Sequence, residues 1–271
     1  MPSEANLRAD AFVGTAQAYL RYRPPYPRAM LADLVAQVRP GPAAKLVDLA
    51  CGPGRVCLDL APSFEMVLAV DLEPEMIDTG RSEAARRGIG NVDWRVCAAE
   101  ELDLPANSVD LITIGEAFHR LDQPVIAAKA LAWLKPGGCL VTLGARGHLD
   151  GPEPWQLAVA AVARRWMARA FPEGVASGRA GAEVGPGAPE RVLRRAGFQG
   201  VDSVDVVEPR DWSFDAILGY LKSTSVCSDN ALGRDAPAFE TELRAALGEA
   251  DVFHEDFLAG YPIGRKPRGT P

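Results

Sequence analysis

The chain has 271 residues, of which 48% are hydrophobic, so it is long enough to bury one substantial core. Its formal net charge of −7 argues against a nucleic-acid binder, because contacts to phosphates need clustered Lys and Arg side chains. No stretch reaches the roughly 18 uncharged apolar residues of a membrane span, and the opening segment MPSEANLRAD lacks the apolar run of a signal peptide. We therefore expect a cytoplasmic protein that binds neither nucleic acid nor a membrane. A homo-oligomer is left open.

Strand-like and helix-like segments alternate five times between residues 45 and 144. Apolar runs predict strands over KLVDLA (45–50), MVLAVDL (66–72), VDWRVCA (92–98), SVDLITIG (108–115) and GCLVTLG (138–144). Helix patterns follow the first two strands and cover QPVIAAKALAWLKPGG (123–138). This alternation predicts an α/β protein with a Rossmann-like, doubly wound, mostly parallel sheet and helical cap insertions.

The pattern changes after residue 150. WQLAVAAVARRWMARAF (155–171) predicts an amphipathic helix, and the Gly-rich GVASGRAGAEVGPGAP (174–189) predicts a flexible loop. VDSVDVV (201–207) and FLAGYPIGRK (257–266) predict two further strands. We therefore expect a single domain, residues 1–271. Its parts are an N-terminal helical lid (1–40), a cofactor-binding core (41–149), cap insertions (150–190 and 211–250) and segments that return to the sheet (191–210 and 251–265).

The cysteines and histidines give no metal-binding pattern. The five cysteines contain no Cys-x-x-Cys pair, and the three histidines are scattered. We interpret the cysteines as reduced, small hydrophobic side chains and expect no metal ion.

The turn after the first predicted strand, VDLACGPGR (47–55), indicates the kind of ligand. Ligands of open α/β sheets bind beyond the carboxyl ends of the strands. A dinucleotide site needs the pattern G-x-G-x-x-G, but Cys57 stands at the third glycine position. Asp48 beside the turn would repel a diphosphate, whereas S-adenosylmethionine carries an ammonium, a sulfonium and no phosphate. Asp71 ends the second strand, where a carboxylate can accept hydrogen bonds from both ribose hydroxyls, and the combination favours S-adenosylmethionine over NAD.

Four segments resemble those of the class I S-adenosylmethionine-dependent methyltransferases that act on small molecules. VDLACGPGR, VLAVDLEPEMID, AAEELDLPANSVDLI and LKPGGCLV follow that family's order and spacing within residues 47–141. YLRYRPPYP (19–27) and AFHRLD (117–122) further resemble the subgroup that includes trans-aconitate methyltransferases. The resemblance implies S-adenosyl-L-methionine as the cofactor and a small-molecule acceptor as the partner.

The resemblance also implies where the cofactor binds. Two glycines, Gly52 and Gly54, would lie under the methionine part, Asp71 would bind the ribose, and Leu72 and Met76 would contact the adenine. The family's Asp-Ala-Glu after the third strand reads Ala98-Ala99-Glu100 here, which leaves the Ala99 backbone and Glu100 or Glu101 to contact adenine. The candidate cofactor contacts are Tyr19, Arg23, Asp48, Ala50, Gly52, Gly54, Asp71, Leu72, Met76, Ala99, Glu100 and Gly115.

Two segments supply the catalytic candidates. Tyrosines 19, 22 and 26 and Arg23 form either a surface helix ended by Pro24-Pro25 or a lid that reaches the methionine carboxylate or the acceptor. Glu116 and His119 follow the fourth strand and should face the space above the sheet, where either can act as a general base. The catalytic candidates are His119, Glu116 and Tyr26.

We expect metal-independent transfer of the sulfonium methyl group to an O, N or C nucleophile of a small molecule, such as a secondary metabolite or a carboxylate. Proximity and orientation would supply most of the catalysis, because the cofactor already carries an activated methyl group. Three alternatives stay open at this point. They are an enzyme that uses the same sulfonium compound for cyclisation, a cofactor-binding protein that has lost catalysis, and a nicotinamide-dependent oxidoreductase.

Overall fold

The computed structural model describes residues 12–147, 149–174 and 178–268. The chain divides into two compact units. The sheet unit comprises Pro25–Gly144, Ser177–Val206 and Ala259–Pro271, and the helical unit comprises Met1–Pro24, Ala145–Ala176 and Val207–Leu258. One boundary falls at Pro24, so the segment predicted as an N-terminal lid contributes to both units.

Seven strands form one sheet in the order β3-β2-β1-β4-β5-β7-β6. The pairs β1–β2, β1–β4, β2–β3 and β4–β5 are parallel. This arrangement confirms the predicted Rossmann-like, mostly parallel sheet, and β7 and β6 complete it. The strands are β1 Lys45–Leu49, β2 Met66–Asp71, β3 Val92–Val96, β4 Val109–Gly115, β5 Leu134–Ala145, β6 Gln199–Trp212 and β7 Phe253–Arg265.

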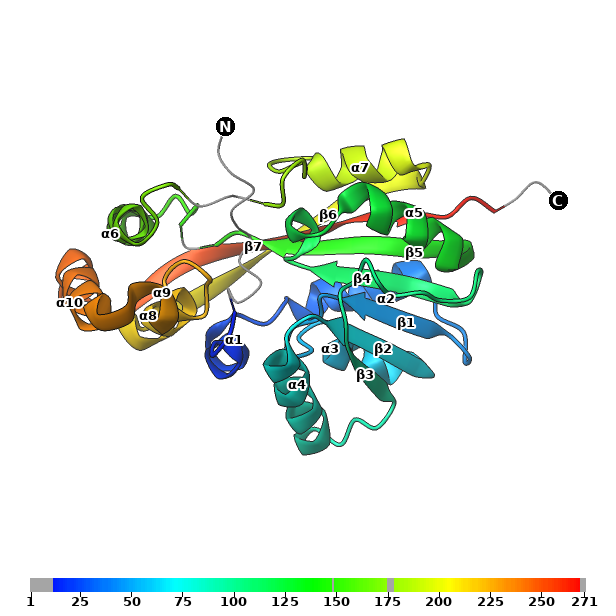
Figure 1. Ribbon diagram of the computed structural model, residues 1–271, viewed down its shortest axis with the longest axis horizontal. Helices are drawn as coiled ribbons and strands as arrows, with labels where there is room; N and C mark the ends of the chain where they lie inside the picture. The colour runs from blue at the N-terminus through cyan, green and yellow to red at the C-terminus, as the bar shows by residue number, and fades with distance from the viewer. Residues whose placement is uncertain (1–11, 148, 175–177, 269–271) are drawn as a thin grey trace. The chain divides into compact units, whose positions relative to one another are not determined.

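Helices cover both faces of the sheet unit (Figure 1). α5 (Gln123–Trp133) and α7 (Ala188–Ala196) lie on one side, and α3 (Cys57–Leu60) and α4 (Pro74–Arg86) lie on the other. α2 (Arg28–Val38) packs against α3. Apolar side chains that alternate along β1, β2 and β4 form the core toward α5 and α7, among them Val47, Leu49, Val70, Ile112 and Ile114.

The alternation of strand and helix is incomplete. Between β3 and β4 the described chain forms turns and extended backbone but no helix, so the predicted fivefold alternation was wrong at this crossover. Two residues of this connection disfavour a helix, because Pro105 lacks an N–H and Asn107 has a left-handed backbone with φ of 56°. The short crossover leaves the segment after β3 close to the ends of the strands.

The helical unit contains α1 (Ala16–Tyr22), α6 (Pro154–Ala170), α8 (Phe214–Lys222), α9 (Asp229–Leu232) and α10 (Ala236–Leu247). α1 packs against α8, and α6 packs against α10. Its core includes the rings of Trp166 and Trp212. The buried Glu255 carboxylate accepts hydrogen bonds from Trp212 Nε1 at 2.7 Å and from Gln156 Nε2 at 2.5 Å. The hydrogen bonds to Glu255 offset the loss of water at this buried carboxylate.

Candidate cofactor and acceptor site

The turn after β1 bends sharply at the carboxyl edge of the sheet. Ala50 and Gly52 both adopt positive φ angles, of 51° and 55°. Gly54 has a φ of 84°, and a β-carbon there would lie 2.7 Å from the Trp94 ring. A side chain at position 54 is therefore excluded by backbone strain and by contact. The left-handed conformation of Ala50, which lacks glycine's freedom, is the kind of local strain that accompanies binding sites.

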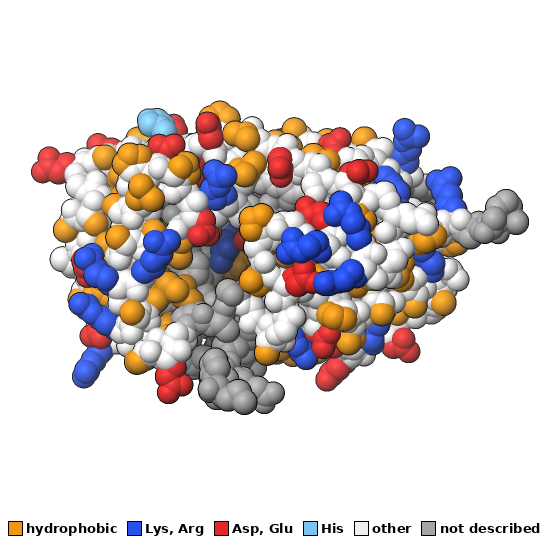
Figure 2. All heavy atoms as spheres, turned by 90° about the horizontal axis from the view of Figure 1, so that it is seen from above, with side chains coloured by type: hydrophobic (Ala, Val, Ile, Leu, Met, Phe, Trp, Pro, Cys, Tyr) orange, Lys and Arg blue, Asp and Glu red, His pale blue; other side chains and the backbone are white. Residues whose placement is uncertain are grey.

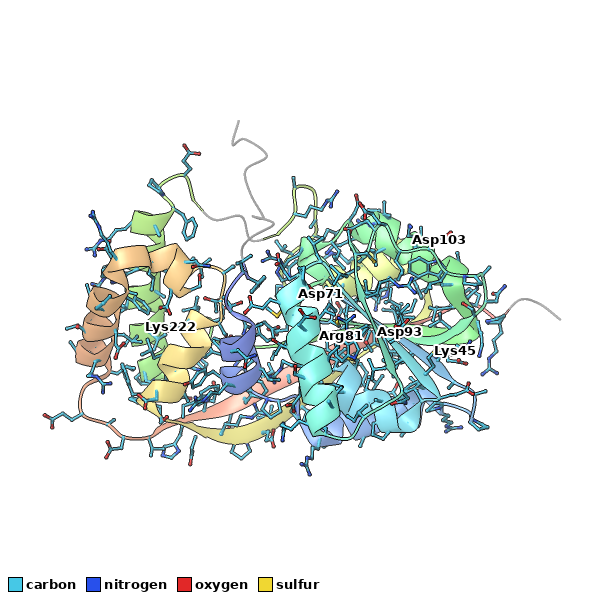
Figure 3. All side chains as sticks on the ribbon, turned by 60° about the horizontal axis from the view of Figure 1, so that its bottom comes forward. Lys45, Asp71, Arg81, Asp93, Asp103 and Lys222 are labelled. Carbon is cyan, nitrogen blue, oxygen red and sulfur yellow. The ribbon has the colours of Figure 1, made fainter. Side chains whose placement is uncertain are left out.

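Asp71 fastens this turn to the end of β2. Its carboxylate accepts hydrogen bonds from the Gly52 N–H at 2.7 Å and from the Glu73 N–H at 2.9 Å. Burial raises the pKa of Asp71, and those N–H groups and the charge of Arg120 partly lower it. Figure 3 shows Asp71 beside the first turn of α4, at the opposite end of the sheet from Lys45. The predicted ribose ligand and the predicted glycine turn are thus directly connected.

From the sequence we expected Asp48 to lie beside the turn and to face the ligand. In the structure Asp48 is buried instead. Its side chain is only 1% exposed within β1. The carboxylate accepts hydrogen bonds from Thr113 Oγ1 at 2.7 Å and from the Cys57 N–H at 3.2 Å. Burial raises the pKa of Asp48 to about 7, although both hydrogen bonds oppose the shift. Asp48 therefore connects β1 and β4 to the chain after the glycine turn, and a cationic ligand at the turn would favour its ionised form.

The residues predicted to contact adenine fall into two groups. Leu72 is 54% exposed, and Val96, the register partner of Asp71 in β3, is 46% exposed. Two apolar side chains are thus available at the edge where an adenine ring would lie. Met76 and Ala99 are 3% and 5% exposed, because their side chains point into the core. The structure therefore places these two side chains away from the surface, which leaves only backbone groups at Ala99 for a ligand.

Glu100 is held by neighbouring groups of the sheet unit. Its Oε1 accepts a hydrogen bond from the Asp122 N–H at 2.8 Å and lies 3.5 Å from Arg179 Nη1. The second guanidinium nitrogen of Arg179 lies 3.4 Å from the Asp122 carboxylate. Glu100 thus joins the segment after β3 to the N-terminus of α5, and contact with adenine remains a prediction.

The end of β4 carries the catalytic candidates. Glu116 has a left-handed backbone, with φ of 54°, and its N–H donates to the Leu143 carbonyl. His119 follows in the short helix η2 (Phe118–Arg120). Burial, with a smaller effect of the Arg120 charge, lowers the pKa of His119. The buried Tyr26 hydroxyl lies 3.4 Å from the point where a β-carbon on Gly115 would stand. Tyr26 and the end of β4 are therefore together in the sheet unit.

Tyr19 and Arg23 belong to the helical unit. The Arg23 guanidinium lies between two rings, 4.7 Å from the Tyr19 centroid and 4.9 Å from the Tyr220 centroid. Arg23 Nε donates to Ser223 Oγ at 2.9 Å. This packing against α8 gives the predicted tyrosine-rich segment a structural role within its own unit, and its contact with a cofactor remains a prediction.

Sequence reasoning missed Thr113, Val96 and Arg179. A polar residue inside the apolar run of β4 could have revealed Thr113, since the buried Asp48 in β1 needs a donor. Val96 follows only from the pairing of β2 with β3. Arg179 lies in the Gly-rich segment predicted as flexible, and no local pattern indicates its contacts.

Three broader features concern metal binding, membrane-spanning helices and surface charge. Within residues 12–147, 149–174 and 178–268, no three His, Cys, Asp or Glu side chains group closely enough to hold a metal ion. In the same described ranges no helix has the length and apolarity that a membrane-spanning helix requires. On the face seen in Figure 2, Lys and Arg side chains are interspersed with Asp and Glu.

The fold is a Rossmann-like sheet, and proteins with such open α/β sheets bind their ligands at the carboxyl edge. A family model described as "Methyltransferase domain" matches residues 46–138. Nocamycin O-methyltransferase of Saccharothrix syringae is 30% identical over 220 residues, which cover 73% of this chain and 75% of that protein. A Dictyostelium discoideum protein named as a methyltransferase is 31% identical over 132 residues, 49% of this chain and 48% of that protein. The chain spans about half the length of this second relative.

Solved structures show the same fold. A Bacillus halodurans protein assigned as a methyltransferase superposes with a TM-score of 0.58 at 18% identity, over 88% of this chain and 99% of that chain. Geranyl diphosphate C-methyltransferase from Streptomyces coelicolor A3(2), crystallised with S-adenosyl-L-homocysteine, gives a TM-score of 0.50 at 18% identity, over 88% of this chain and 75% of that chain. The chain belongs to the class I S-adenosylmethionine-dependent methyltransferases, and S-adenosylmethionine is its cofactor.

Proposed function

We propose that this protein transfers the methyl group of S-adenosylmethionine to an O, N or C nucleophile of a small molecule. The observation that carries the proposal is the hydrogen bond from the Gly52 N–H to the Asp71 carboxylate, which fixes the glycine turn at the end of β2. The same carboxylate would accept hydrogen bonds from the ribose hydroxyls. The exposed Leu72 and Val96 offer apolar contact to adenine. Burial raises the pKa of Asp48 to about 7, and a cationic ligand at the turn would favour the ionised form of this carboxylate.

The cofactor supplies a methyl group already activated by its bond to a sulfonium. This chain's residues bind and orient the two reactants, which is the main requirement for in-line displacement. As the acceptor atom bonds to the methyl carbon, the carbon–sulfur bond breaks and its electron pair returns to sulfur. A proton on the acceptor would go to the neutral imidazole of His119, and burial favours that neutral form by lowering the pKa of His119. Glu116 is the competing base.

An oxygen acceptor is favoured among the three atom types. The relative that aligns over 73% of the chain is an O-methyltransferase. Hydroxyl groups need a base to lose their proton, which gives His119 or Glu116 a task, whereas a carboxylate needs none. No contact of the described residues favours cyclisation or nicotinamide chemistry.

The proposal is tested by calorimetric titration followed by an acceptor screen. S-adenosylhomocysteine should bind, and NAD should not. The protein is then incubated with S-adenosylmethionine and pooled small molecules bearing hydroxyl, carboxyl or amino groups, and products are identified by mass spectrometry. Formation of a methylated acceptor together with S-adenosylhomocysteine supports methyl transfer. Formation of 5′-methylthioadenosine instead would show cyclisation, and binding without any product would indicate lost catalysis.

A further inference from the structure

Part of the Gly-rich segment that the sequence predicts as a flexible loop packs against the turn that carries His119. We define this segment, residues 178–184, as the strap. The Arg179 N–H donates a hydrogen bond to the His119 carbonyl at 2.8 Å. A β-carbon on Gly178 would lie 2.7 Å from the same oxygen. The strap thus donates one hydrogen bond to this carbonyl, and at Gly178 it passes too close to the carbonyl to leave room for a side chain.

The other end of the strap is fixed to α5. Gln123 Nε2 donates to the Glu183 carbonyl at 3.0 Å, and the Glu183 N–H donates to Gln123 Oε1 at 2.8 Å. Gln123 is only 2% exposed. The Glu183 carboxylate also pairs with Arg191 Nε at 3.0 Å, and with Arg195. The strap is therefore held at both ends by groups of its own unit.

The ring of His119 has no hydrogen-bond partner among the residues that the structure describes. A general base is usually oriented by a group that bonds to its second nitrogen. Here the orientation of the imidazole depends instead on the backbone at His119. That backbone is constrained by the bond from Arg179 and, one residue later, by the Arg120 N–H, which donates to the Ala117 carbonyl at 2.8 Å.

We propose that Gly178 and Arg179 are positioning residues for methyl transfer, because they fix the main chain of His119 and so set the pose of its imidazole. This inference rests on the proposed role of His119 in methyl transfer. The ion pairs of Arg179 with Glu100 and Asp122 contribute less, since the Arg179 side chain is 48% exposed and such pairs are weak. The hydrogen bond from the Arg179 N–H to the His119 carbonyl is the dominant restraint, and the small size of Gly178 permits the close approach of the two segments.

The test compares Gly178→Ala with Gly90→Ala. The added methyl group at 178 must displace the His119 carbonyl, whereas a β-carbon at Gly90 meets nothing within 4 Å. The chain has three histidines, so NMR can follow each imidazole, and the His119→Ala spectrum assigns the signal. In Gly178→Ala the His119 pKa should rise toward the unperturbed value of about 6.5, because the ring becomes more exposed. In Gly90→Ala it should not change.

Turnover supplies the second readout. Turnover is measured with an acceptor identified in the screen. Gly178→Ala should lower kcat by about 10-fold to 100-fold, while the affinity for S-adenosylhomocysteine changes less than about twofold. Arg179→Ala should lower kcat less, and Arg179→Lys should restore part of it. If Gly178→Ala does not fold, the comparison of Arg179→Ala with Arg179→Lys tests whether the strap positions His119. Folded variants with an unchanged His119 titration and unchanged kcat would overturn the inference. Failure of the wild-type protein to bind S-adenosylhomocysteine would instead refute the proposed function, and the NMR readout stays valid in that case.

Discussion

Asp48 and Thr113 form a hydrogen bond of 2.7 Å between β1 and β4, inside the core of the sheet unit. The two strands pair in parallel with these residues in register. The Asp48 carboxylate also accepts the Cys57 N–H, so one buried acid connects the centre of the sheet to the chain that follows the glycine turn. Ionising a carboxylate that is buried in this way costs free energy, so the stability of the fold around the glycine turn should depend on pH.

The first prediction concerns the pH dependence of stability without ligand. Asp48 has a pKa of about 7 in the folded state against 3.8 for the free side chain, so the folded state holds its proton more tightly. The stabilisation from this proton is present near pH 4 and is lost as the pH rises through about 7, on the order of a few kcal/mol. Asp48→Asn should therefore flatten the fall in melting temperature between pH 5 and 8. Asp110→Asn, at the partly exposed end of β4, should leave that slope intact.

The second prediction concerns Asp71. Asp71→Ala should weaken binding of S-adenosylhomocysteine by about 1.5–3 kcal/mol, the range for hydrogen bonds to a charged group. Calorimetry measures the change. Asp71→Asn is the matched control, because its carbonyl can still accept the Gly52 N–H and preserve the turn. Unchanged affinity in a folded Asp71→Ala protein would remove Asp71 from the ribose site.

The third prediction concerns the general base. His119→Ala should lower the rate by about 10²-fold to 10⁴-fold with little change in cofactor affinity. The wild-type rate should rise with pH through a limb below the ordinary value of 6.5, because burial lowers the pKa of His119 and the neutral imidazole is the active form. A pH–rate profile of His119→Ala and Glu116→Gln separates the two candidates. A limb that survives His119→Ala unchanged belongs to another group.

The fourth prediction concerns Arg23 in the helical unit. Arg23→Ala removes a guanidinium held between Tyr19 and Tyr220 and its bond to Ser223, so it should destabilise this unit by about 1–2 kcal/mol. Arg21→Ala removes one contact, with Tyr22 at 5.1 Å, and should cost less. Chemical denaturation measures both. Equal stability of the two variants would contradict the importance of this stacked arrangement.

Much of the sheet unit could be predicted because apolar runs mark buried parallel strands and glycine marks the turn that follows β1. The link between Asp71 and the glycine turn also follows, since the ends of neighbouring parallel strands lie at one edge. The missing helix between β3 and β4 did not follow, because the alternation elsewhere favoured one. The docking of Arg179 could not be predicted, since its partners Asp122, His119 and Glu100 lie 57 to 79 positions away and Gly-rich composition indicates only conformational freedom.

The buried position of Asp48 shows a further limit. The sequence places an acid beside the glycine turn, but whether it points to the ligand or into the sheet depends on the register of β1 with β4. The direction of the Met76 side chain could not be predicted either, because Met76 lies on the buried face of α4 together with Ile77 and Ala84. In both cases the place of the residue in the chain is evident from the sequence, whereas the direction of its side chain required the structure.

The most direct test of the account follows a labelled methyl group from S-adenosylmethionine. The protein is incubated with cofactor labelled on the methyl carbon and with a small-molecule acceptor from the pooled screen. The account predicts that the label appears on the acceptor in equal amount with S-adenosylhomocysteine, and that Asp71→Ala lowers this transfer at limiting cofactor. Cofactor consumption that yields 5′-methylthioadenosine, or binding with no label on any acceptor, would contradict it.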